Sequence, residues 1–236
     1  MKGLYVMLPT LNEEEALESV IARIPVSALK KMNWKPRIVV VDGGSEDSTI
    51  EIANNLGCES IVQWGKGKGA GMRQAFEHFL TTDDQALVML DADGTYSPEE
   101  MIDLLINLSN ENVVIGDRLH GKMGVDAMTP LNWAGNHMLT WLAVALHGKT
   151  VNDLCSGYWA FSRFAIENLK LNSMRFEIEA EMYTSCALQG ITISHVPISY
   201  SKRIGEAKLG SIKDGGSIAR KLIIRRIFPI PHEAIE

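Results

Sequence analysis

Short apolar runs alternate with segments of helical periodicity through the first half of the chain. The runs are rich in β-branched residues: LYVML (4–8), RIVVV (37–41), SIVQW (60–64), ALVML (86–90) and NVVIG (112–116). Between them, apolar residues recur at helical spacing over residues 13–24, 47–57, 69–80 and 97–108. This alternation predicts βαβ units and a mostly parallel central sheet with helices on both faces, which is an α/β fold.

The second half of the chain has longer helical patterns. Helices are predicted over about 130–147 and 176–189, and residues 191–200 alternate like a strand. The tail, residues 211–228, is helical in pattern and basic. We predict one globular domain over residues 1–210, followed by a basic and apolar C-terminal helix over residues 211–236.

Composition limits the compartment and the partners. Hydrophobic residues make up 46% of the chain and charged residues 22%, which is typical of a globular protein. The formal net charge of -6 argues against a nucleic-acid partner. Cys58, Cys155 and Cys186 have no CxxC spacing and indicate a reducing compartment. No apolar run reaches the roughly 18–20 residues of a membrane span. We therefore expect a cytoplasmic protein, either free or peripheral on the cytoplasmic face of a membrane.

Polar clusters follow three of the predicted strands. They are PTLNEEE (9–15), DGGSEDST (42–49) and DADGT (91–95). Ligands of open α/β sheets bind beyond the carboxyl ends of the strands, so these clusters are the candidate site. No GxGxxG follows the first strand and no GxxxxGK[ST] occurs. Neither a dinucleotide cofactor nor a P-loop is therefore expected.

DADGT supports two kinds of chemistry. Asp91 and Asp93 can hold Mg²⁺ or Mn²⁺ by carboxylate oxygens, with Gly94 allowing the chain to bend between strand and turn. Such an ion would neutralise charge on a diphosphate leaving group. The alternative is a resemblance to haloacid-dehalogenase-type phosphatases, whose first Asp attacks phosphorus. Those enzymes carry DxDGT on the first strand and need a later acidic pair, and Asp117 has no acid four residues on. The metal hypothesis is favoured.

The ordered set of motifs resembles family 2 glycosyltransferases with the GT-A fold, a Rossmann-like fold that binds nucleotide sugars. PTLNEEE, VVVDGGSEDST, GKGKGAGMR and LDADG occur in that order. GDRL, DLCSGYWAFSR, FEIEAEMYTSCALQG and VPISYSKRIGEAKL then resemble the dolichyl-phosphate mannose and glucose synthases. The resemblance extends to about residue 215. It implies an inverting, metal-dependent enzyme that moves a sugar from a UDP- or GDP-sugar to a polyprenyl or dolichyl phosphate.

The resemblance also implies roles for single residues. The implied nucleotide-binding residues are Pro9, Asn12, Glu13, Asp42, Lys68, Arg73, Asp91, Arg203 and Lys208. Arg203 and Lys208 are the implied loop cations that close over the diphosphate, and Arg118 is the implied acceptor-phosphate arginine. Asp91 and Asp93 are the implied metal ligands. Glycines beside Lys68 are expected to let the backbone approach the donor phosphates.

Asp153 distinguishes two classes of acceptor. A hydroxyl acceptor needs a general base, and Asp153 can serve as one. A lipid phosphate needs none, because its oxygen is already anionic. Two alternatives stay open: a family 2 enzyme acting on a soluble hydroxyl with Asp153 as base, and a non-catalytic module that binds nucleotide sugars or lipids. Glu181 is interpreted as a surface acid as readily as a functional one.

Two apolar segments are candidates for contact with a lipid acceptor or a membrane. Residues 138–149, MLTWLAVALHGK, are interpreted as a core helix. ARKLIIRRIF, residues 219–228, combines four cations with an apolar face. A helix of this kind can lie in a membrane interface, so we expect peripheral membrane contact there or attachment through a membrane partner.

Overall fold

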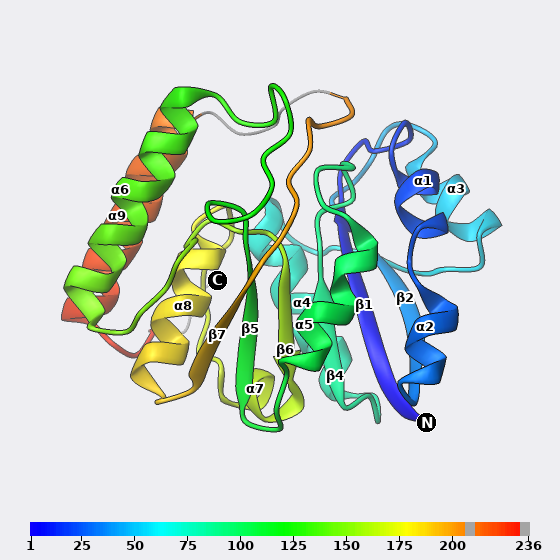
Figure 1. Cartoon of the computed structure of the whole chain (residues 1–236), viewed down its shortest axis with the longest axis horizontal. Coiled ribbons are helices and arrows are strands. Elements are labelled where there is room, and N and C mark those ends of the chain that lie inside the picture. Colours follow the sequence, from blue (N-terminus) through cyan, green and yellow to red (C-terminus); the bar gives the residue numbers. More distant parts are fainter. Residues whose placement is uncertain (206–210, 232–236) are drawn as a thin grey trace.

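A seven-stranded sheet forms the centre of the computed structural model, which describes residues 1–205 and 211–231 (Figure 1). Its strands are Lys2–Thr10 (β1), Trp34–Asp42 (β2), Glu59–Val62 (β3), Ala86–Met89 (β4), Asn112–Asp117 (β5), Trp159–Ser162 (β6) and Thr192–Pro197 (β7). Their order is β3-β2-β1-β4-β6-β5-β7. Only β6 runs antiparallel to its neighbours among these strands, so the sheet is mostly parallel, as predicted.

Helices cover both faces of this sheet. They are Leu17–Ala22 (α1), Val26–Lys31 (α2), Thr49–Asn55 (α3), Lys68–Leu80 (α4), Met101–Ile106 (α5), Pro130–His147 (α6), Arg163–Asn168 (α7), Ile178–Leu188 (α8) and Ser211–Ile227 (α9), with a 3₁₀ turn, η1, at Pro98–Glu100. One apolar core lies under α1, α2, α3 and α5, and the other under α4, α6, α7, α8 and α9. The fold therefore has three layers.

The side chains of β1 show how one strand supplies both cores. Leu4, Val6 and Leu8 point into the first core, while Tyr5 and Met7 point into the second. Successive residues of a strand face opposite sides of a sheet, so a run that is apolar at every position requires a covered layer on each side.

The helix pattern of the second half was only partly correct. The predicted helices over 130–147 and 176–189 are present as α6 and α8, and the tail forms α9, but β6 and α7 were not predicted, nor was α2 in the first half. The interpretation of residues 138–149 as a core helix is correct for one face only, since Leu139 and Ala143 belong to the apolar core. Within α6 only Leu139, Thr140 and Ala143 are buried, and Trp141 is 70% exposed. One side of α6 therefore faces away from the core.

The last helix packs against two others. α9 contacts α6 and α8, and α6 and α9 run side by side at one end of the molecule (Figure 1). Ile218 and Leu222 of α9 belong to the same apolar core as α4 and α8. None of the described helices is both long enough and apolar enough to cross a bilayer.

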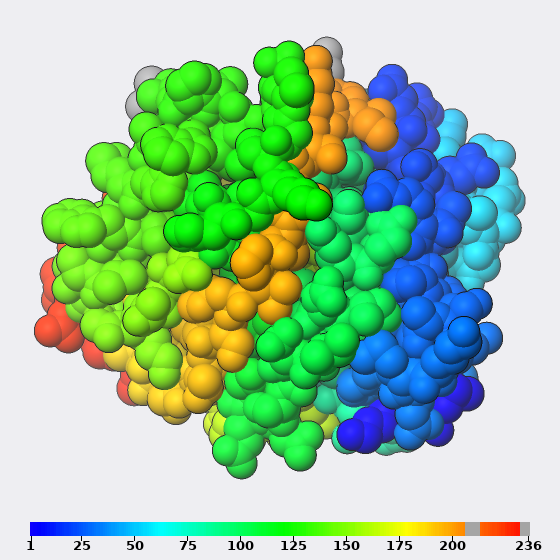
Figure 2. Space-filling model, in the orientation of Figure 1, coloured from blue at the N-terminus to red at the C-terminus, as the bar shows by residue number. Residues whose placement is uncertain are grey.

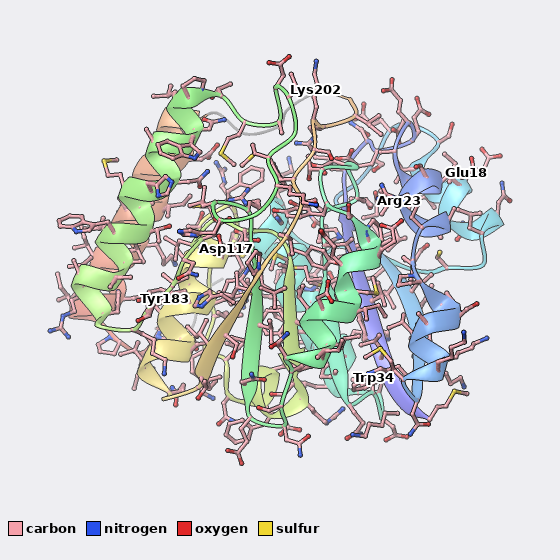
Figure 3. All side chains as sticks on the ribbon, in the orientation of Figure 1. Glu18, Arg23, Trp34, Asp117, Tyr183 and Lys202 are labelled. Carbon is pink, nitrogen blue, oxygen red and sulfur yellow. The ribbon has the colours of Figure 1, made fainter. Side chains whose placement is uncertain are left out.

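The six parallel strands, all except β6, bring their carboxyl ends to one edge of the sheet. Figure 3 shows Trp34, at the start of β2, near the opposite edge, and Lys202, beyond β7, at the carboxyl edge. There the chain after β7 lies beside the loop after β5 (Figure 2). The Tyr200 N–H donates to the Lys122 carbonyl at 2.9 Å. This edge carries the three polar clusters.

Candidate functional site

A cavity of about 430 Å³ opens at the carboxyl edge of the sheet. This volume lies within the range typical of small-molecule sites. Segments that follow β1, β2, β3, β4 and β5 line it, together with parts of α8 and α9. The charged side chains of the lining are Glu13, Lys66, Lys68, Asp91, Asp93, Arg118, Arg175, Glu179 and Arg203.

Asp91 and Asp93 both reach this cavity. The Asp91 side chain is 27% exposed and that of Asp93 is 7% exposed. Asp93 Oδ1 accepts hydrogen bonds from the Thr95 backbone N–H (3.0 Å) and hydroxyl (2.6 Å). Gly94 has a φ of +77°, which a glycine adopts without a steric penalty. The bend predicted from the sequence is therefore present and turns both carboxylates toward one space.

Lys68 lies between two carboxylates at the start of α4. Its Nζ is 2.7 Å from Asp91 Oδ1 and 2.7 Å from Glu179 Oε1. Burial alone would lower the pKa of Lys68, but the charges of Asp91 and Glu179 outweigh it and raise the pKa above its ordinary value. Burial raises the pKa of Glu179, and Lys68 offsets part of that shift. The cavity therefore holds a fixed ammonium group beside Asp91.

Glu179 was missed by the sequence analysis. It is one of three acids spaced two apart on FEIEAEMY, and its neighbours in sequence are apolar on both sides. The side chain is 9% exposed in its ion pair with Lys68. No local pattern distinguishes it from Glu177 or Glu181, because its contact is with a lysine in another helix.

Arg203 joins two acids of the cavity. Its Nη2 lies 3.0 Å from Glu13 Oε1 and 3.1 Å from Asp93 Oδ2. Burial lowers the pKa of Arg203, but Asp93 and Glu13 raise it above the ordinary value. The structure thus brings Glu13, Asp93 and Arg203 together, although Arg203 is far from the other two in sequence. Lys208, the other predicted loop cation, lies outside the described residues.

Arg118 and Asp153 form a buried, two-pronged ion pair. Arg118 Nε donates to Asp153 Oδ2 (2.7 Å) and Nη2 donates to Oδ1 (2.8 Å). The Arg118 backbone N–H adds a third bond, to Oδ2 (3.1 Å). Asp153 is fully buried and does not belong to the cavity lining, whereas Arg118 does. Asp153 therefore orients Arg118, and the hypothesis that it takes a proton from an acceptor does not fit this geometry.

Three predicted nucleotide-binding residues are not part of this lining and have side-chain contacts with other parts of the chain. Asp42 accepts hydrogen bonds from the backbone N–H groups of Gly44 (2.9 Å) and Ser45 (3.0 Å), which closes its own turn. The Asn12 side chain accepts from the Glu46 N–H (2.8 Å). Arg73 Nη1 lies 3.5 Å from the sulfur of Met174. None of the three is among the described residues that line the cavity, whereas Pro9 is.

The glycines around Lys68 also make a backbone contact that the sequence did not predict. A Cβ on Gly67 would lie 2.5 Å from the Met174 carbonyl oxygen, and one on Gly69 would lie 2.6 Å from the Ser173 carbonyl oxygen. The Ala70 N–H also donates to the Met174 carbonyl (3.1 Å). These glycines therefore allow close contact with the backbone at residues 173–174. Gly67 and Gly71 also line the cavity, so the approach of this backbone to the donor phosphates stays a prediction.

This contact predicts opposite effects of adding a methyl group at two glycines. We expect Gly69→Ala to lower the free energy of unfolding by about 1–3 kcal/mol, since its Cβ meets backbone atoms that cannot move aside cheaply. At Gly135, inside α6, a Cβ would meet no atom within 4 Å, so Gly135→Ala should raise the free energy of unfolding by about 0.5–1 kcal/mol. Urea unfolding of both variants checks the pair. Equal changes in the free energy of unfolding would contradict a close contact between Gly69 and the backbone at residues 173–174.

The donor set fits a divalent cation that shares its coordination with a ligand. Asp91 and Asp93 supply hard carboxylate oxygens at the wall of the cavity. Among the described residues, no group of three or more His, Cys, Asp or Glu side chains forms a complete metal cage. Mg²⁺ and similar ions are commonly bound by one or two carboxylates plus substrate phosphates and water. The two acids are therefore sufficient if a diphosphate completes the site.

Comparisons with known proteins identify the family. Residues 5–170 match the family model described as glycosyl transferase family 2. The chain is 36% identical over 223 residues to glycosyltransferase AglJ of Haloferax volcanii, covering 93% of this chain and 71% of that protein. It is 34% identical over 222 residues to the dolichyl-phosphate hexose transferase of the same organism, covering 93% and 92%.

A solved structure shares the fold. Glucosyl-3-phosphoglycerate synthase from Mycobacterium tuberculosis, in complex with Mn²⁺, UDP and glucosyl-3-phosphoglycerate, superposes with a TM-score of 0.69 at 20% identity. The match covers 98% of this chain and 82% of that chain.

Proposed function

Because the chain belongs to glycosyl transferase family 2 and has the GT-A fold that the sequence predicted, we propose which acceptor it glycosylates. The proposed reaction moves a sugar from a UDP- or GDP-sugar to a polyprenyl phosphate. A relative at 34% identity is named dolichyl-phosphate hexose transferase, which supports this acceptor class. The runner-up is a family 2 enzyme acting on a soluble hydroxyl.

The ion pairs made by the acids of the cavity favour a phosphate acceptor over a hydroxyl acceptor. Each acid described in the cavity lining has a cation beside it: Glu13 and Asp93 contact Arg203, and Asp91 and Glu179 contact Lys68. Asp153, the base that a hydroxyl acceptor would need, is buried with both oxygens bonded to Arg118. An acceptor phosphate arrives with its own negative charge and needs a cation instead of a base. Arg118 offers that cation in the cavity wall.

The proposed chemistry follows from these positions. An oxygen of the acceptor phosphate attacks the anomeric carbon, a new carbon–oxygen bond forms, and the bond to the nucleoside diphosphate breaks. Attack from the face opposite the leaving group inverts the anomeric configuration. Lys68 and Arg203 stabilise negative charge on the departing diphosphate by fixed electrostatics. A Mg²⁺ or Mn²⁺ ion held by Asp91 and Asp93 would act there as a Lewis acid.

A donor and acceptor panel tests this proposal. Purified protein is incubated with Mn²⁺ or Mg²⁺ and with UDP- or GDP-sugars, each with and without a short polyprenyl phosphate. We expect nucleoside diphosphate release that requires the lipid phosphate and the metal. Release that does not depend on lipid would favour the soluble acceptor or hydrolysis, and binding without release would favour a non-catalytic module.

A lipid acceptor also requires contact with a membrane surface, and α6 is suited to it. α6 contains no Asp, Glu, Lys or Arg, and its Leu131, Met138 and Trp141 are 63%, 65% and 70% exposed. Beside it, α9 exposes Arg220 and Arg226 together with Ile223 and Ile227. Exposed apolar and aromatic side chains next to cations are typical of helices that lie in a membrane interface. We propose that this helix pair is the peripheral membrane contact.

Replacing one exposed tryptophan tests whether the α6 surface is the one that binds membranes. We expect Trp141→Ser to reduce co-sedimentation with vesicles containing anionic lipid by several-fold, because Trp141 lies on the uncharged face of α6. Trp64→Ser is the matched control: Trp64 is 59% exposed but follows β3, which lies at the other end of the strand order from β7. Equal binding by both variants would contradict the assignment of α6.

A further inference from the structure

We infer that Glu181 and Arg225 are positioning residues for Lys68. They form an ion cluster between α8 and α9 that fixes the backbone at residues 172–174, and this backbone seats the glycine segment, residues 65–71, that carries Lys68. The inference rests on the proposed function only in assigning Lys68 to the donor diphosphate. The structural linkage itself is independent of the substrate.

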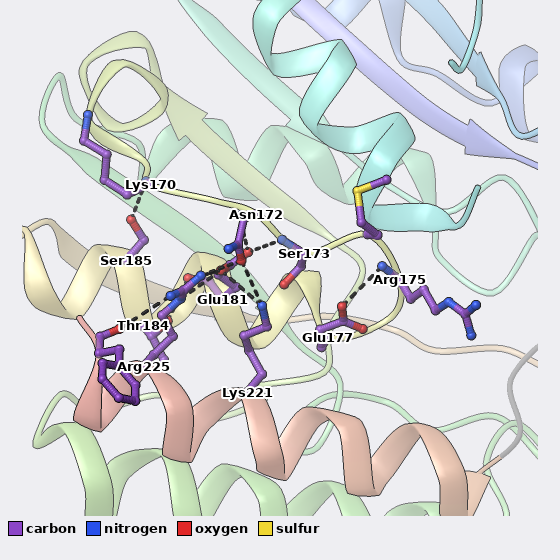
Figure 4. Close-up of polar contacts among 12 residues, drawn as sticks. Lys170, Asn172, Ser173, Arg175, Glu177, Glu181, Thr184, Ser185, Lys221 and Arg225 are labelled. Atoms are coloured by element: carbon purple, nitrogen blue, oxygen red, sulfur yellow. Dashed lines mark hydrogen bonds and ion pairs between the residues drawn. The ribbon is translucent and has the colours of Figure 1, made fainter. Parts of the chain in front are cut away.

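The cluster centres on one carboxylate, that of Glu181 (Figure 4). Glu181 is fully buried, and Arg225 is 4% exposed. Glu181 Oε1 accepts from Arg225 Nε at 2.8 Å and from Arg225 Nη2, and Lys221 Nζ lies 3.4 Å away. Burial raises the pKa of Glu181, but Lys221 and Arg225 outweigh it and hold the pKa below its ordinary value. The expectation that Glu181 is as readily a surface acid is therefore wrong.

The second oxygen of Glu181 holds a turn of the backbone. Glu181 Oε2 accepts from the backbone N–H groups of Asn172 (2.8 Å) and Ser173 (2.6 Å). The Asn172 side chain is held as well, since its Oδ1 accepts from Arg225 Nη2 (2.5 Å) and Lys221 Nζ (3.1 Å). Buried charges are stable only when their partners are in place. The turn at 172–173 is therefore fixed by both the carboxylate and the α9 cations.

This turn continues directly into the contact with the glycine segment. The Ser173 carbonyl oxygen lies 2.6 Å from the position of a Cβ on Gly69, and the Met174 carbonyl oxygen lies 2.5 Å from that of a Cβ on Gly67. The Met174 carbonyl also accepts a hydrogen bond from the Ala70 N–H. Backbone packed this closely against backbone has no room to shift on one side alone. A displacement of residues 173–174 must therefore move the start of α4.

The start of α4 is where Lys68 reaches its two acids. Helix α8 supports Lys68 twice: directly through Glu179, and indirectly through Glu181 two residues further on. Helix α9 takes part through Arg225 and Lys221, and its Ile218 lines the cavity. The C-terminal helix is thus connected through consecutive contacts to Lys68, which the proposed function assigns to the donor diphosphate. A change in how α9 is seated should change how the donor is held.

Glu181→Gln and Arg225→Met test the linkage. We expect each to raise the KM for the donor about tenfold or more, while the KM for the acceptor changes less than about twofold. Arg225→Lys keeps the charge and should recover donor KM to within about threefold of wild type. Asp84→Asn is the matched control, because Asp84 is a buried acid that precedes β4, at the amino ends of the parallel strands and away from the cavity.

Amide hydrogen exchange supplies a readout that needs no substrate. In Glu181→Gln and Arg225→Met, exchange should accelerate in peptides covering residues 65–71 and 172–175, and in Asp84→Asn it should not. If wild-type protein binds no nucleotide sugar, the proposed function fails while the exchange result still decides the linkage. Unchanged exchange at 65–71, or the same increase in Asp84→Asn, would overturn the inference. If Glu181→Gln does not fold, Arg225→Met and Arg225→Lys give the same comparison.

Discussion

Replacing Asp91 by Asn is expected to lower kcat by about 10²–10³-fold, because fixed electrostatic stabilisation of the leaving group is worth that much in enzyme sites. Asp91 lines the cavity and faces the space that Lys68 and Arg203 border. Asparagine keeps the shape of the side chain but removes the charge that would hold Mg²⁺ or Mn²⁺. Initial rates at saturating donor, acceptor and Mn²⁺ measure the effect.

The control for this variant is a carboxylate that takes no part in the site. Asp83→Asn removes an acid just before the amino end of β4 and should leave kcat within about twofold of wild type. Asp91→Asn should also remain folded, because Lys68 keeps its second partner, Glu179. Calorimetric titration with Mn²⁺ and the nucleoside diphosphate should show weaker binding in Asp91→Asn alone. Wild-type kcat in that variant would refute the metal assignment.

Replacing Asp153 by Asn should affect stability more than chemistry. Arg118 would stay buried beside a neutral amide, and breaking a buried ion pair typically costs about 3–5 kcal/mol of unfolding free energy. Since Asp153 orients Arg118 and does not line the cavity, we expect the rate per folded molecule to fall less than about tenfold. Urea unfolding and transfer assays on the same preparations measure the two effects.

The general-base hypothesis predicts the reverse for Asp153→Asn. Loss of a general base costs about 10²–10⁴-fold in rate and removes the acidic limb of the pH–rate profile. Arg118→Lys supplies the matched comparison, because lysine keeps the charge but loses the two-pronged geometry. We expect it to raise the KM for the lipid phosphate while the KM for the donor stays near wild type. An Asp153→Asn variant that is stable but inactive would contradict the acceptor assignment.

The sequence predicted the parts of the fold that depend on local pattern. The five apolar runs of the first half became strands, and their polar ends met at one edge, because strand alternation and parallel connection fix that arrangement. WAFS, residues 159–162, was missed because this short run is a strand only through its antiparallel partners β4 and β5. Exposure of α6 was missed for a similar reason: apolar composition alone does not show which face a neighbour covers.

The site was predictable where one motif sufficed and unpredictable where distant groups combine. Asp91, Asp93 and Arg203 were assigned to the cavity that the structure shows. Glu179 was not, since only the folded chain brings it to Lys68. Asp42 was assigned to the nucleoside, yet its carboxylate caps its own turn. Asp side chains often bond the backbone two residues on, and the Asp-Gly-Gly-Ser sequence carried that signal.

The most direct test of the acceptor is the identity of the product. Wild-type protein, Mn²⁺ and the active nucleotide sugar are incubated with a polyprenyl phosphate, with the corresponding polyprenol or with a soluble hydroxyl acceptor, and the products are analysed by mass spectrometry. Our account predicts one new lipid, a polyprenyl phosphate carrying a single sugar on its phosphate, and no product from the polyprenol. A glycosylated polyprenol or soluble hydroxyl, with no sugar on the lipid phosphate, would contradict it.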